Sequence, residues 1–202
     1  MIETRHALEN ARRDLGDDAW VALLEEFVPD HAALMEALRA RLPLQQETLR
    51  FAGKEVRTPR LTSWHGDPGA AYAYSGRRFE PAPWTPELLA VKDRVDSAVG
   101  VRFNSVLANY YRDGGDSMGE HADDEPELGP ARDNILIASV SLGVRRRFLL
   151  RHKRTGTVHE FSLGEGNLLV MGGTTQLQYR HRVPRTAANV GPRMNLTFRV
   201  VL

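Results

Sequence analysis

The sequence predicts an α+β, mostly β fold: a jelly roll, or double-stranded β-helix, with N-terminal helices backing one sheet. Two stretches with helical periodicity lie in the first half, at residues 30–42 and 85–100. Beyond residue 103, short apolar stretches follow one another, separated by turns that contain glycine. Helices followed by many short strands are typical of two packed sheets with helices behind one of them.

The composition limits the class of protein and the kind of metal site. A chain of 202 residues suits one domain with a substantial core. Because the chain has no cysteine, disulfides, iron–sulfur clusters and thiolate zinc sites are excluded, and any metal must be bound through nitrogen and oxygen. No apolar run reaches the length of a membrane span, and the first residues are too polar for a secretory signal. We therefore expect a cytoplasmic protein.

Three helices are expected before residue 101. The first covers residues 19–27. The second begins after Asp30 as N-cap, and the third begins with Thr85 as N-cap and Pro86 in its first turn and ends at Gly100. The apolar stripe of the second helix consists of Leu34, Leu38 and Leu42, and that of the third of Leu88, Val91, Val95 and Val99. Such stripes predict helices that pack against a sheet.

Short strands are expected along most of the remaining chain. Residues 48–51 and 55–57 flank Ala52 and Gly53, which predicts a hairpin. Tyr72 and Tyr74 alternate on a further strand and would face the same way. The later strands are expected at residues 135–142, 147–152, 158–163, 167–171 and 193–199.

Histidine and aspartate spacing predicts a metal site. If His121 and Asp123 lie on one strand, their side chains point to the same face and can share a cation. His181, from a different strand, would complete a set of two histidines and one carboxylate, which suits non-heme Fe(II) and leaves positions open. A lone His-x-Asp is a weak signal, because it is often a hydrogen-bonded surface pair. The other histidines that lack a partner at ligand spacing are expected at the surface: His6, His31, His152 and His159.

The C-terminal strand alternates strictly between polar and apolar residues. Its polar positions are Arg193, Asn195, Thr197 and Arg199, and its apolar positions are Met194, Leu196, Phe198 and Val200. One reading is an edge strand with one solvated face. In the other reading, the two guanidinium groups, whose backbones are roughly 20 Å apart, hold a short dicarboxylate between them, since each planar fork binds a carboxylate bidentately.

Charge is distributed unevenly although the formal net charge is only +1. Residues 1–42 hold five arginines and nine acidic residues, and the rest of the chain is basic. The densest basic cluster consists of Arg145, Arg146, Arg147, Arg151, Lys153 and Arg154. It is either a solvated hairpin or an edge that contacts nucleic-acid phosphates.

Four motifs occur in register: Asn-x-Tyr at Asn109, His-x-Asp at His121, His-x-x-Pro at His181 and Arg-x-Asn-Leu-Thr-Phe-Arg at Arg193. In this order and spacing, the series resembles the AlkB family of alkylated-nucleic-acid dioxygenases, and most closely its duplex-DNA-acting branch. The resemblance covers about residues 45–202. It implies an N-terminal helical extension at 1–44, and a nucleotide-recognition lid plus jelly-roll core at 45–202, within one domain.

The resemblance also implies the cofactors and the residues that bind them. Fe(II) would be held by His121, Asp123 and His181, and O2 would be the oxidant. The cosubstrate 2-oxoglutarate would be bound by Asn109, Tyr111, Arg193, Asn195, Thr197 and Arg199, with Arg193 at the distal carboxylate and Arg199 near the metal-bound end.

Oxidative demethylation of 1-methyladenine and 3-methylcytosine in DNA, with release of formaldehyde, is the activity that the resemblance implies. Tyr74 would stack on the flipped base with Tyr72 nearby, and Asp124 and Glu125 would favour a cationic base. In the duplex-acting branch, the turn of the hairpin expected here at residues 48–57 carries a bulky apolar residue that inserts into the base stack as a wedge. The aligned position in this sequence is Ala52, so the neighbouring Phe51 is either the wedge or a core residue. Methylated RNA or a protein side chain is an alternative substrate, and a catalytically silent binding module is an alternative class. A monomer is expected.

Overall fold

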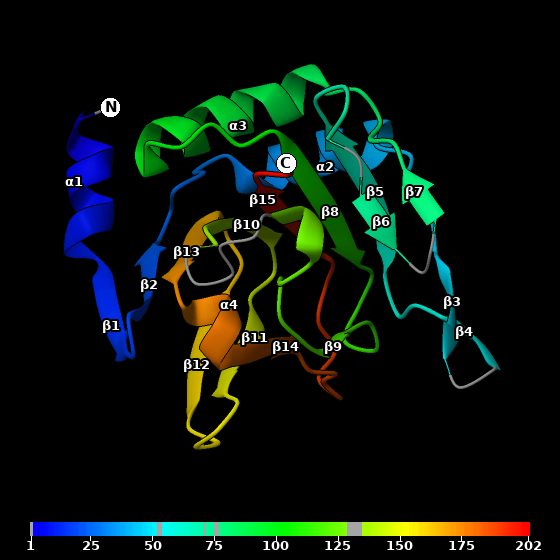
Figure 1. The fold of residues 1–202 in the computed structure, drawn as a ribbon. Helices are drawn as coiled ribbons and strands as arrows, with labels where there is room; N and C mark the ends of the chain where they lie inside the picture. Colours follow the sequence, from blue (N-terminus) through cyan, green and yellow to red (C-terminus); the bar gives the residue numbers. More distant parts are fainter. Residues whose placement is uncertain (1, 52–53, 71, 75–76, 129–134) are drawn as a thin grey trace.

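Two antiparallel β-sheets and three longer helices make up the computed structural model, which describes residues 2–51, 54–70, 72–74, 77–128 and 135–202 (Figure 1). The large sheet has seven strands in the order β1-β2-β13-β10-β15-β8-β5. Its strands are β1 (Arg12–Gly16), β2 (Ala19–Leu24), β13 (Asn167–Gly173), β10 (Ile137–Gly143), β15 (Arg193–Arg199), β8 (Ser105–Tyr111) and β5 (Leu61–Gly66).

The small sheet has four strands in the order β12-β11-β14-β9. They are β12 (Val158–Leu163), β11 (Arg146–His152), β14 (Tyr179–Val183) and β9 (Met118–His121). Two hairpins complete the β-structure: β3 (Thr48–Phe51) with β4 (Lys54–Arg57), and β6 (Tyr72–Tyr74) with β7 (Arg77–Phe79). The two-sheet jelly roll predicted from the sequence is therefore confirmed.

Helices cover the outer face of the large sheet, as Figure 1 shows for α3. The helical elements are α1 (Ile2–Asn10), α2 (His31–Arg41), α3 (Pro86–Val99), the short α4 (Thr175–Gln178) and the 3-10 turn η1 (Pro126–Leu128). None of the helices in the described part of the chain is long and apolar enough to span a membrane.

The two ends of α3 follow the chemistry predicted for them. The Thr85 side chain accepts a hydrogen bond from the Leu88 amide, as an N-cap does. Gly100 lies in the left-handed region, with φ of 78°, and its amide bonds the Asp96 carbonyl. A residue with a side chain would be strained in that backbone conformation, so glycine ends the helix there.

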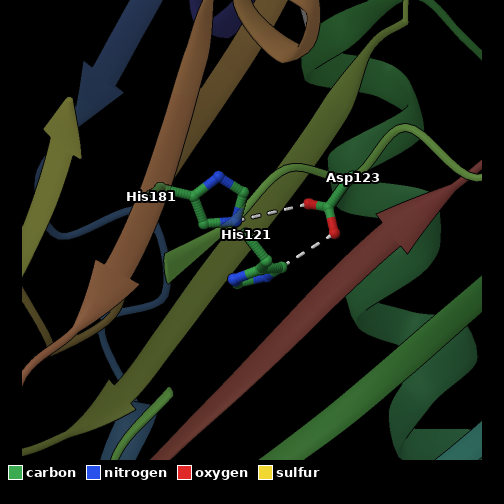
Figure 2. Close-up of side chains that lie close together, drawn as sticks. All are labelled: His121, Asp123 and His181. Atoms are coloured by element: carbon green, nitrogen blue, oxygen red, sulfur yellow. Dashed lines mark ion pairs between the residues drawn. The ribbon is translucent and has the colours of Figure 1, made fainter. Parts of the chain in front are cut away.

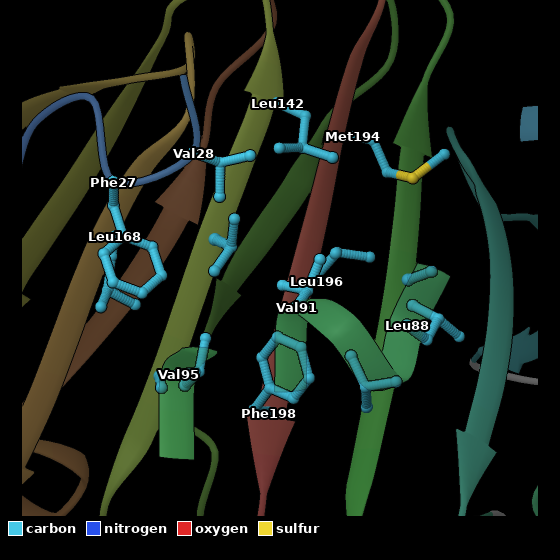
Figure 3. Close-up of a cluster of buried hydrophobic side chains, with 14 of the residues drawn as sticks. Phe27, Val28, Leu88, Val91, Val95, Leu142, Leu168, Met194, Leu196 and Phe198 are labelled. Carbon is cyan, nitrogen blue, oxygen red and sulfur yellow. The ribbon is translucent and has the colours of Figure 1, made fainter. Parts of the chain in front are cut away.

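The apolar face of β15 packs against α3. Met194, Leu196 and Phe198 are fully buried and join Leu88, Val91 and Val95 in one core (Figure 3). A second core lies between the two sheets and includes Tyr111, Phe148 and Leu150. The alternation predicted for residues 193–199 is thus confirmed. Its reading as an edge strand is wrong, because β15 lies between β10 and β8 and all of its residues are buried.

The N-terminal segment differs from its prediction. Residues 19–24 form strand β2 rather than a helix, and β2 pairs with β1 on one side and β13 on the other. The sequence Ala-Trp-Val-Ala-Leu-Leu is apolar throughout, so its periodicity does not separate a buried strand from a buried helix. The partner strand β13 lies more than 140 residues away along the chain, so the pairing that decides the structure is absent from local sequence.

Candidate active site

A cavity of about 1280 Å³ lies between the two sheets. Its lining includes the polar face of β15, the end of β9 and residues from the β5 side of the large sheet. A single small-molecule ligand occupies roughly 300–1,000 Å³, so this cavity has room for more than one small group. Ten of the fourteen residues predicted for the site line it: Asn109, Tyr111, His121, Asp123, Glu125, His181, Arg193, Asn195, Thr197 and Arg199.

His121, Asp123 and His181 converge on one point of the cavity wall (Figure 2). Each offers a ligand atom, and these atoms all lie within 4.8 Å of one another. The two histidines meet because β9 pairs with β14 in a register that places His121 opposite His181. Asp123 arrives differently from the prediction: β9 ends at His121, so Asp123 lies in the following loop.

The surroundings of the two imidazoles suit metal binding. The Nδ1 of His121 lies 2.9 Å from the Gly119 carbonyl, and donation of this N–H leaves Nε2 free to ligate. Burial, followed by repulsion from His121, lowers the pKa of His181 to about 3. His181 is therefore uncharged near neutral pH, and a metal ion need not displace a proton from it.

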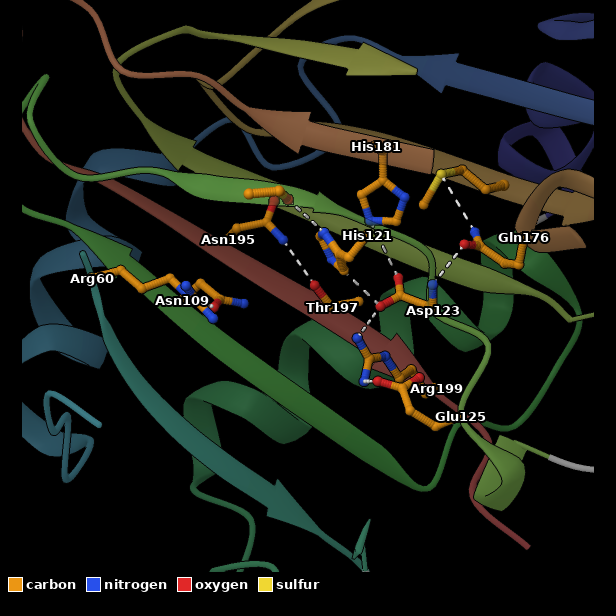
Figure 4. Close-up of polar contacts among 12 residues, drawn as sticks. Arg60, Asn109, His121, Asp123, Glu125, Gln176, His181, Asn195, Thr197 and Arg199 are labelled. Carbon is orange, nitrogen blue, oxygen red and sulfur yellow. Dashed lines mark hydrogen bonds and ion pairs between the residues drawn. The ribbon is translucent and has the colours of Figure 1, made fainter. Parts of the chain in front are cut away.

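Asp123 is only 2% exposed yet keeps its charge. Burial is the largest single effect and raises its pKa, but the attraction of Arg199, followed by that of His181 and His121, together outweighs burial and the net pKa is lowered. Arg199 donates from Nη2 to Asp123 Oδ1, and its Nη1 lies 3.8 Å from Glu125 Oε1 (Figure 4). The site thus offers two imidazole nitrogens and one carboxylate, a set that suits Fe(II) and contains no thiolate.

Arg193 is buried to 1% exposure beside the same cavity. Its Nη2 donates to Ser141 Oγ at 2.7 Å and to Asn195 Oδ1 at 2.9 Å, and its Nε donates to the Leu163 carbonyl. Its Nη1 has no hydrogen-bond partner among the described residues. A buried cationic donor without an acceptor is costly, so a carboxylate of a bound diacid fits this position.

The remaining predicted cosubstrate residues lie in register with Arg193. Strand β8 pairs with β15 so that Tyr111 is opposite Arg193 and Asn109 is opposite Asn195. The Tyr111 ring centroid is 5.3 Å from the Arg193 guanidinium carbon. Asn195 donates from Nδ2 to Thr197 Oγ1 at 2.9 Å. One polar surface therefore runs along the large sheet from Arg193 to Arg199.

Comparison with known proteins assigns the family. Residues 21–199 match the model of the 2OG-Fe(II) oxygenase superfamily. DNA oxidative demethylase ALKBH2 of Mus musculus is 38% identical over 95% of this chain and 88% of its own length. The chain belongs to the AlkB family of this superfamily. Human ALKBH2 is 41% identical over 79% of this chain and 66% of its own length. Human alkB homolog 3, an alpha-ketoglutarate-dependent dioxygenase, is 38% identical over 83% of this chain and 60% of its own length.

Solved structures agree with the fold. The structure of OsALKBH1 superposes with a TM-score of 0.64 over 93% of this chain and all of that one, at 20% identity. An oxygenase of the same superfamily from Burkholderia pseudomallei gives a TM-score of 0.58 over 98% of this chain and 90% of that one, at 17% identity. The superfamily match and the similarity to mouse ALKBH2, in turn, show that this AlkB-family protein is a dioxygenase that uses Fe(II), 2-oxoglutarate and O2.

The predicted substrate residues of this AlkB-family protein are only partly described. Phe51 lies at the end of β3, and Tyr72 and Tyr74 lie on β6, but their side chains are outside the described part, as is Ala52. Glu125 lines the cavity. Asp124 is not among the lining residues, and its Oδ2 lies 3.8 Å from Lys153 Nζ. The roles of these five residues stay predictions.

The basic cluster is largely neutralised within the AlkB-family fold. Arg146 is buried and donates to the carbonyls of Asp113, Asp116 and Pro184. The other members each lie within 4.0 Å of a carboxylate: Arg145 of Glu25 and Glu165, Arg147 of Glu160, Arg151 of Glu120, Lys153 of Asp124 and Arg154 of Asp17. These contacts favour the reading of the cluster as a folded hairpin with paired charges.

Sequence reasoning missed two polar residues of the site. Arg60 lines the cavity and donates from Nε to Asn109 Oδ1 at 2.8 Å. Gln176 accepts a hydrogen bond from the Asp123 amide. Neither stands in a motif or at ligand spacing, so no local signal marks them. The prediction that His152 is a surface residue is wrong: it is 6% exposed, and its Nδ1 accepts from the Arg154 and Thr155 amides.

Proposed function

We propose that this protein removes methyl groups from base nitrogens of DNA, with 1-methyladenine and 3-methylcytosine as substrates. The observation that carries the proposal is the convergence of His121, Asp123 and His181 beside the buried Arg193, in a cavity with room for a cosubstrate and a base. The relatives named DNA oxidative demethylase, at 38–41% identity in mouse and human, support DNA as the substrate.

The metal-binding residues and the two arginines of the site would have separate tasks in this reaction. His121, Asp123 and His181 would hold Fe(II), and oxidation of the methyl group by O2 is the chemistry that the bound iron supplies. Arg199 keeps Asp123 ionised, and burial keeps His181 neutral. Both side chains are therefore in the protonation state that a metal ligand needs.

Arg193 would bind the distal carboxylate of 2-oxoglutarate through Nη1, the donor that has no partner among the described residues. Ser141 and Asn195 hold its other nitrogen, so the guanidinium is already oriented before the diacid arrives. Tyr111, Asn109 and Thr197 would line the length of the diacid, and Arg199 would lie near its metal-bound end.

The reaction balances when one O2 and one 2-oxoglutarate are consumed for each methyl group. One oxygen atom enters succinate as CO2 leaves, and the other converts N–CH3 to N–CH2OH. Cleavage of the N–CH2OH carbon–nitrogen bond then leaves its electron pair on the base nitrogen, and the hydroxyl group loses its proton to solvent as formaldehyde is released. A base inside a duplex must first be flipped into the cavity, where Glu125 would favour a cationic methylated base and Phe51, Tyr72, Tyr74 and Asp124 would assist recognition.

An assay with defined oligonucleotides tests the proposal. The protein is incubated with Fe(II), 2-oxoglutarate and ascorbate, together with single-stranded DNA, duplex DNA or RNA that carries one 3-methylcytosine. We expect formaldehyde and unmodified cytosine from DNA in equal amounts, and no product from His121→Ala or Asp123→Ala. His31→Ala is the matched control, because His31 begins α2 and is not among the cavity residues.

Two results of that assay would redirect the proposal. Turnover of the RNA substrate alone would replace DNA by RNA while leaving the iron and cosubstrate roles in place. Consumption of 2-oxoglutarate without any repaired base would point to another methylated substrate. The monomeric state and the cytoplasmic location expected from the sequence remain predictions, which size-exclusion chromatography and cell fractionation test.

A further inference from the structure

Asp123 lies outside the β-sheets, so the ladder that fixes His121 and His181 does not fix it. Strand β9 ends at His121, and the two following residues form a loop. A ligand on a loop is held less firmly than a ligand on a strand unless other contacts fix its backbone. Arg199 holds the carboxylate of Asp123 directly, whereas the position of the Asp123 backbone depends on what holds the loop.

Gln176 contacts the backbone of this loop (Figure 4). Its side-chain Oε1 accepts a hydrogen bond from the Asp123 amide at 2.9 Å, although the two residues are 53 positions apart. The Nε2 of the same side chain lies 3.6 Å from Met171 Sδ, so the amide is oriented with its oxygen toward Asp123. Gln176 is only 1% exposed, and water does not compete for this bond.

Lys153 adds two contacts at the same place. Its Nζ donates to the Gln176 carbonyl at 2.9 Å and lies 3.8 Å from Asp124 Oδ2. The lysine thus joins the short helix α4 to the residue that follows Asp123. Lys153, a member of the basic cluster of the sequence, therefore has a structural role in the fold.

Helix α4 is itself fixed to the large sheet. Thr175 Oγ1 lies 2.6 Å from the Gly172 carbonyl and 3.0 Å from the Trp20 carbonyl, either of which can accept its one hydrogen, and it accepts a hydrogen bond from the Trp20 amide at 3.1 Å. Trp20 belongs to β2 and Gly172 to β13. Strands β2 and β13 therefore both fix the short helix α4, from which Gln176 reaches Asp123.

We propose that Gln176 is a positioning residue for the metal centre: its side-chain carbonyl fixes the Asp123 backbone and, with Lys153, sets the carboxylate against the two histidines. This role rests on the metal site of the proposed function. Residues that orient metal ligands without touching the metal change metal affinity by roughly 10- to 100-fold when they are replaced. Gln176 acts on affinity for the ion and leaves the diacid site unchanged.

Calorimetric titration of the full chain with Mn(II) alone tests this role, because it reads metal affinity without turnover. Gln176→Met keeps the length of the side chain but removes the acceptor, and we expect a Mn(II) dissociation constant about tenfold higher or more. Gln176→Glu keeps an acceptor at the same reach and should bind Mn(II) more tightly than Gln176→Met. Gln178→Met, two residues later on α4 with a half-buried side chain, is the matched control and should bind as the parent does.

Equal Mn(II) affinity in the parent and in Gln176→Met would overturn the positioning role and leave the metal site intact. Equal weakening in Gln178→Met would also overturn it, since general disturbance of α4 would then explain the loss. If the parent itself does not bind Mn(II), the metal site and the proposed function fail.

Circular dichroism checks folding of each variant. Should Gln176→Met not fold, Lys153→Met, at a half-exposed position, takes its place: weaker Mn(II) binding supports the role and unchanged binding overturns it.

Discussion

Arg193 is buried as deeply as the core leucines, yet it carries a charge. Its 1% exposure and the donor at Nη1 without a partner among the described residues set it apart from an ordinary structural arginine. Three of its neighbours, Ser141, Asn195 and the Leu163 carbonyl, accept its other N–H groups. At the scale of one residue, the side chain is oriented for an anion that the protein does not itself supply.

Replacement of Arg193 by alanine is expected to raise the KM for 2-oxoglutarate roughly 10- to 100-fold, because a charge-assisted hydrogen bond contributes about 1.5–3 kcal/mol. The Mn(II) dissociation constant should change little, since His121, Asp123 and His181 remain. Steady-state kinetics with varied 2-oxoglutarate measures the effect. Arg145→Ala, which removes a surface arginine paired with Glu25 and Glu165, is the control, and an unchanged KM in Arg193→Ala would contradict the assignment.

Burial of His65 makes the free energy of unfolding depend on pH. It is 2% exposed, its Nε2 lies 2.8 Å from Ser63 Oγ, and its Nδ1 lies 2.7 Å from the Pro83 carbonyl. Burial lowers its pKa below 6.5 despite the bond to Pro83, which acts in the opposite direction. Between this lowered pKa and about pH 6.5, the unfolded chain binds a proton at His65 and the folded chain does not, so the stability contributed by this group falls as the pH falls through that window.

His65→Gln should therefore flatten the acid side of the stability profile. The parent is expected to lose up to about 1.4 kcal/mol per pH unit through this group below pH 6.5, and the variant should lose that much less. Urea unfolding near neutral pH and about one to two units lower measures the difference. An identical pH dependence in both proteins would show that His65 is protonated in the folded state.

At the scale of the element, two expected N-caps behave differently. The Thr85 side chain accepts from the Leu88 amide, whereas the Asp30 side chain makes no capping bond to α2. Thr85→Ala should lower the free energy of unfolding by about 1 kcal/mol, within a range of roughly 0.5–2 kcal/mol. Asp30→Ala is the matched comparison and should cost less. Equal losses in urea unfolding would contradict the difference, and neither change should affect turnover because both helices lie on the outer face of the large sheet.

The structure of the final strand, β15, could be predicted only in part from its own sequence. Its alternation predicted correctly that Met194, Leu196 and Phe198 enter a core while the residues between them share a polar face. Its neighbours could not be predicted, because β10 and β8 come from distant parts of the sequence. Those neighbours place Ser141 and Asn109 opposite Asn195 and so build the polar surface of the cavity.

At the scale of the whole molecule, the candidate metal and diacid sites join the two sheets. His121 and His181 come from the small sheet, and Arg193 comes from the large one. Ligands that bind only the folded state stabilise it by about 2.7 kcal/mol at one hundred times their dissociation constant. Separation of the sheets must release both ligands, so their binding should be visible in global unfolding.

Mn(II) with 2-oxoglutarate is therefore expected to raise the Tm by roughly 5–10 °C for a chain of this size. Scanning calorimetry measures the shift, and chelation of the metal should reverse it. In His121→Ala the shift should be absent, because one imidazole of the set is missing. The same shift in that variant would mean that Mn(II) binds elsewhere on the protein.

The sequence by itself determined what depends on neighbouring residues. The third helix with its Thr85 cap and Gly100 end, the alternation of residues 193–199, and a metal site made only of nitrogen and oxygen ligands all follow from local pattern and composition. The four motifs in register also predicted the AlkB family, which the superfamily match over residues 21–199 and the 38% identity to mouse ALKBH2 confirm together.

Tertiary structure alone decided what depends on distant partners. It made residues 19–24 a strand, placed His181 opposite His121, paired the basic cluster with carboxylates, and brought Gln176 to the Asp123 amide. The physical reason is the same in each case. Strand register and ion pairing are fixed by contacts between segments tens to more than a hundred residues apart, and no local periodicity records which segments will meet.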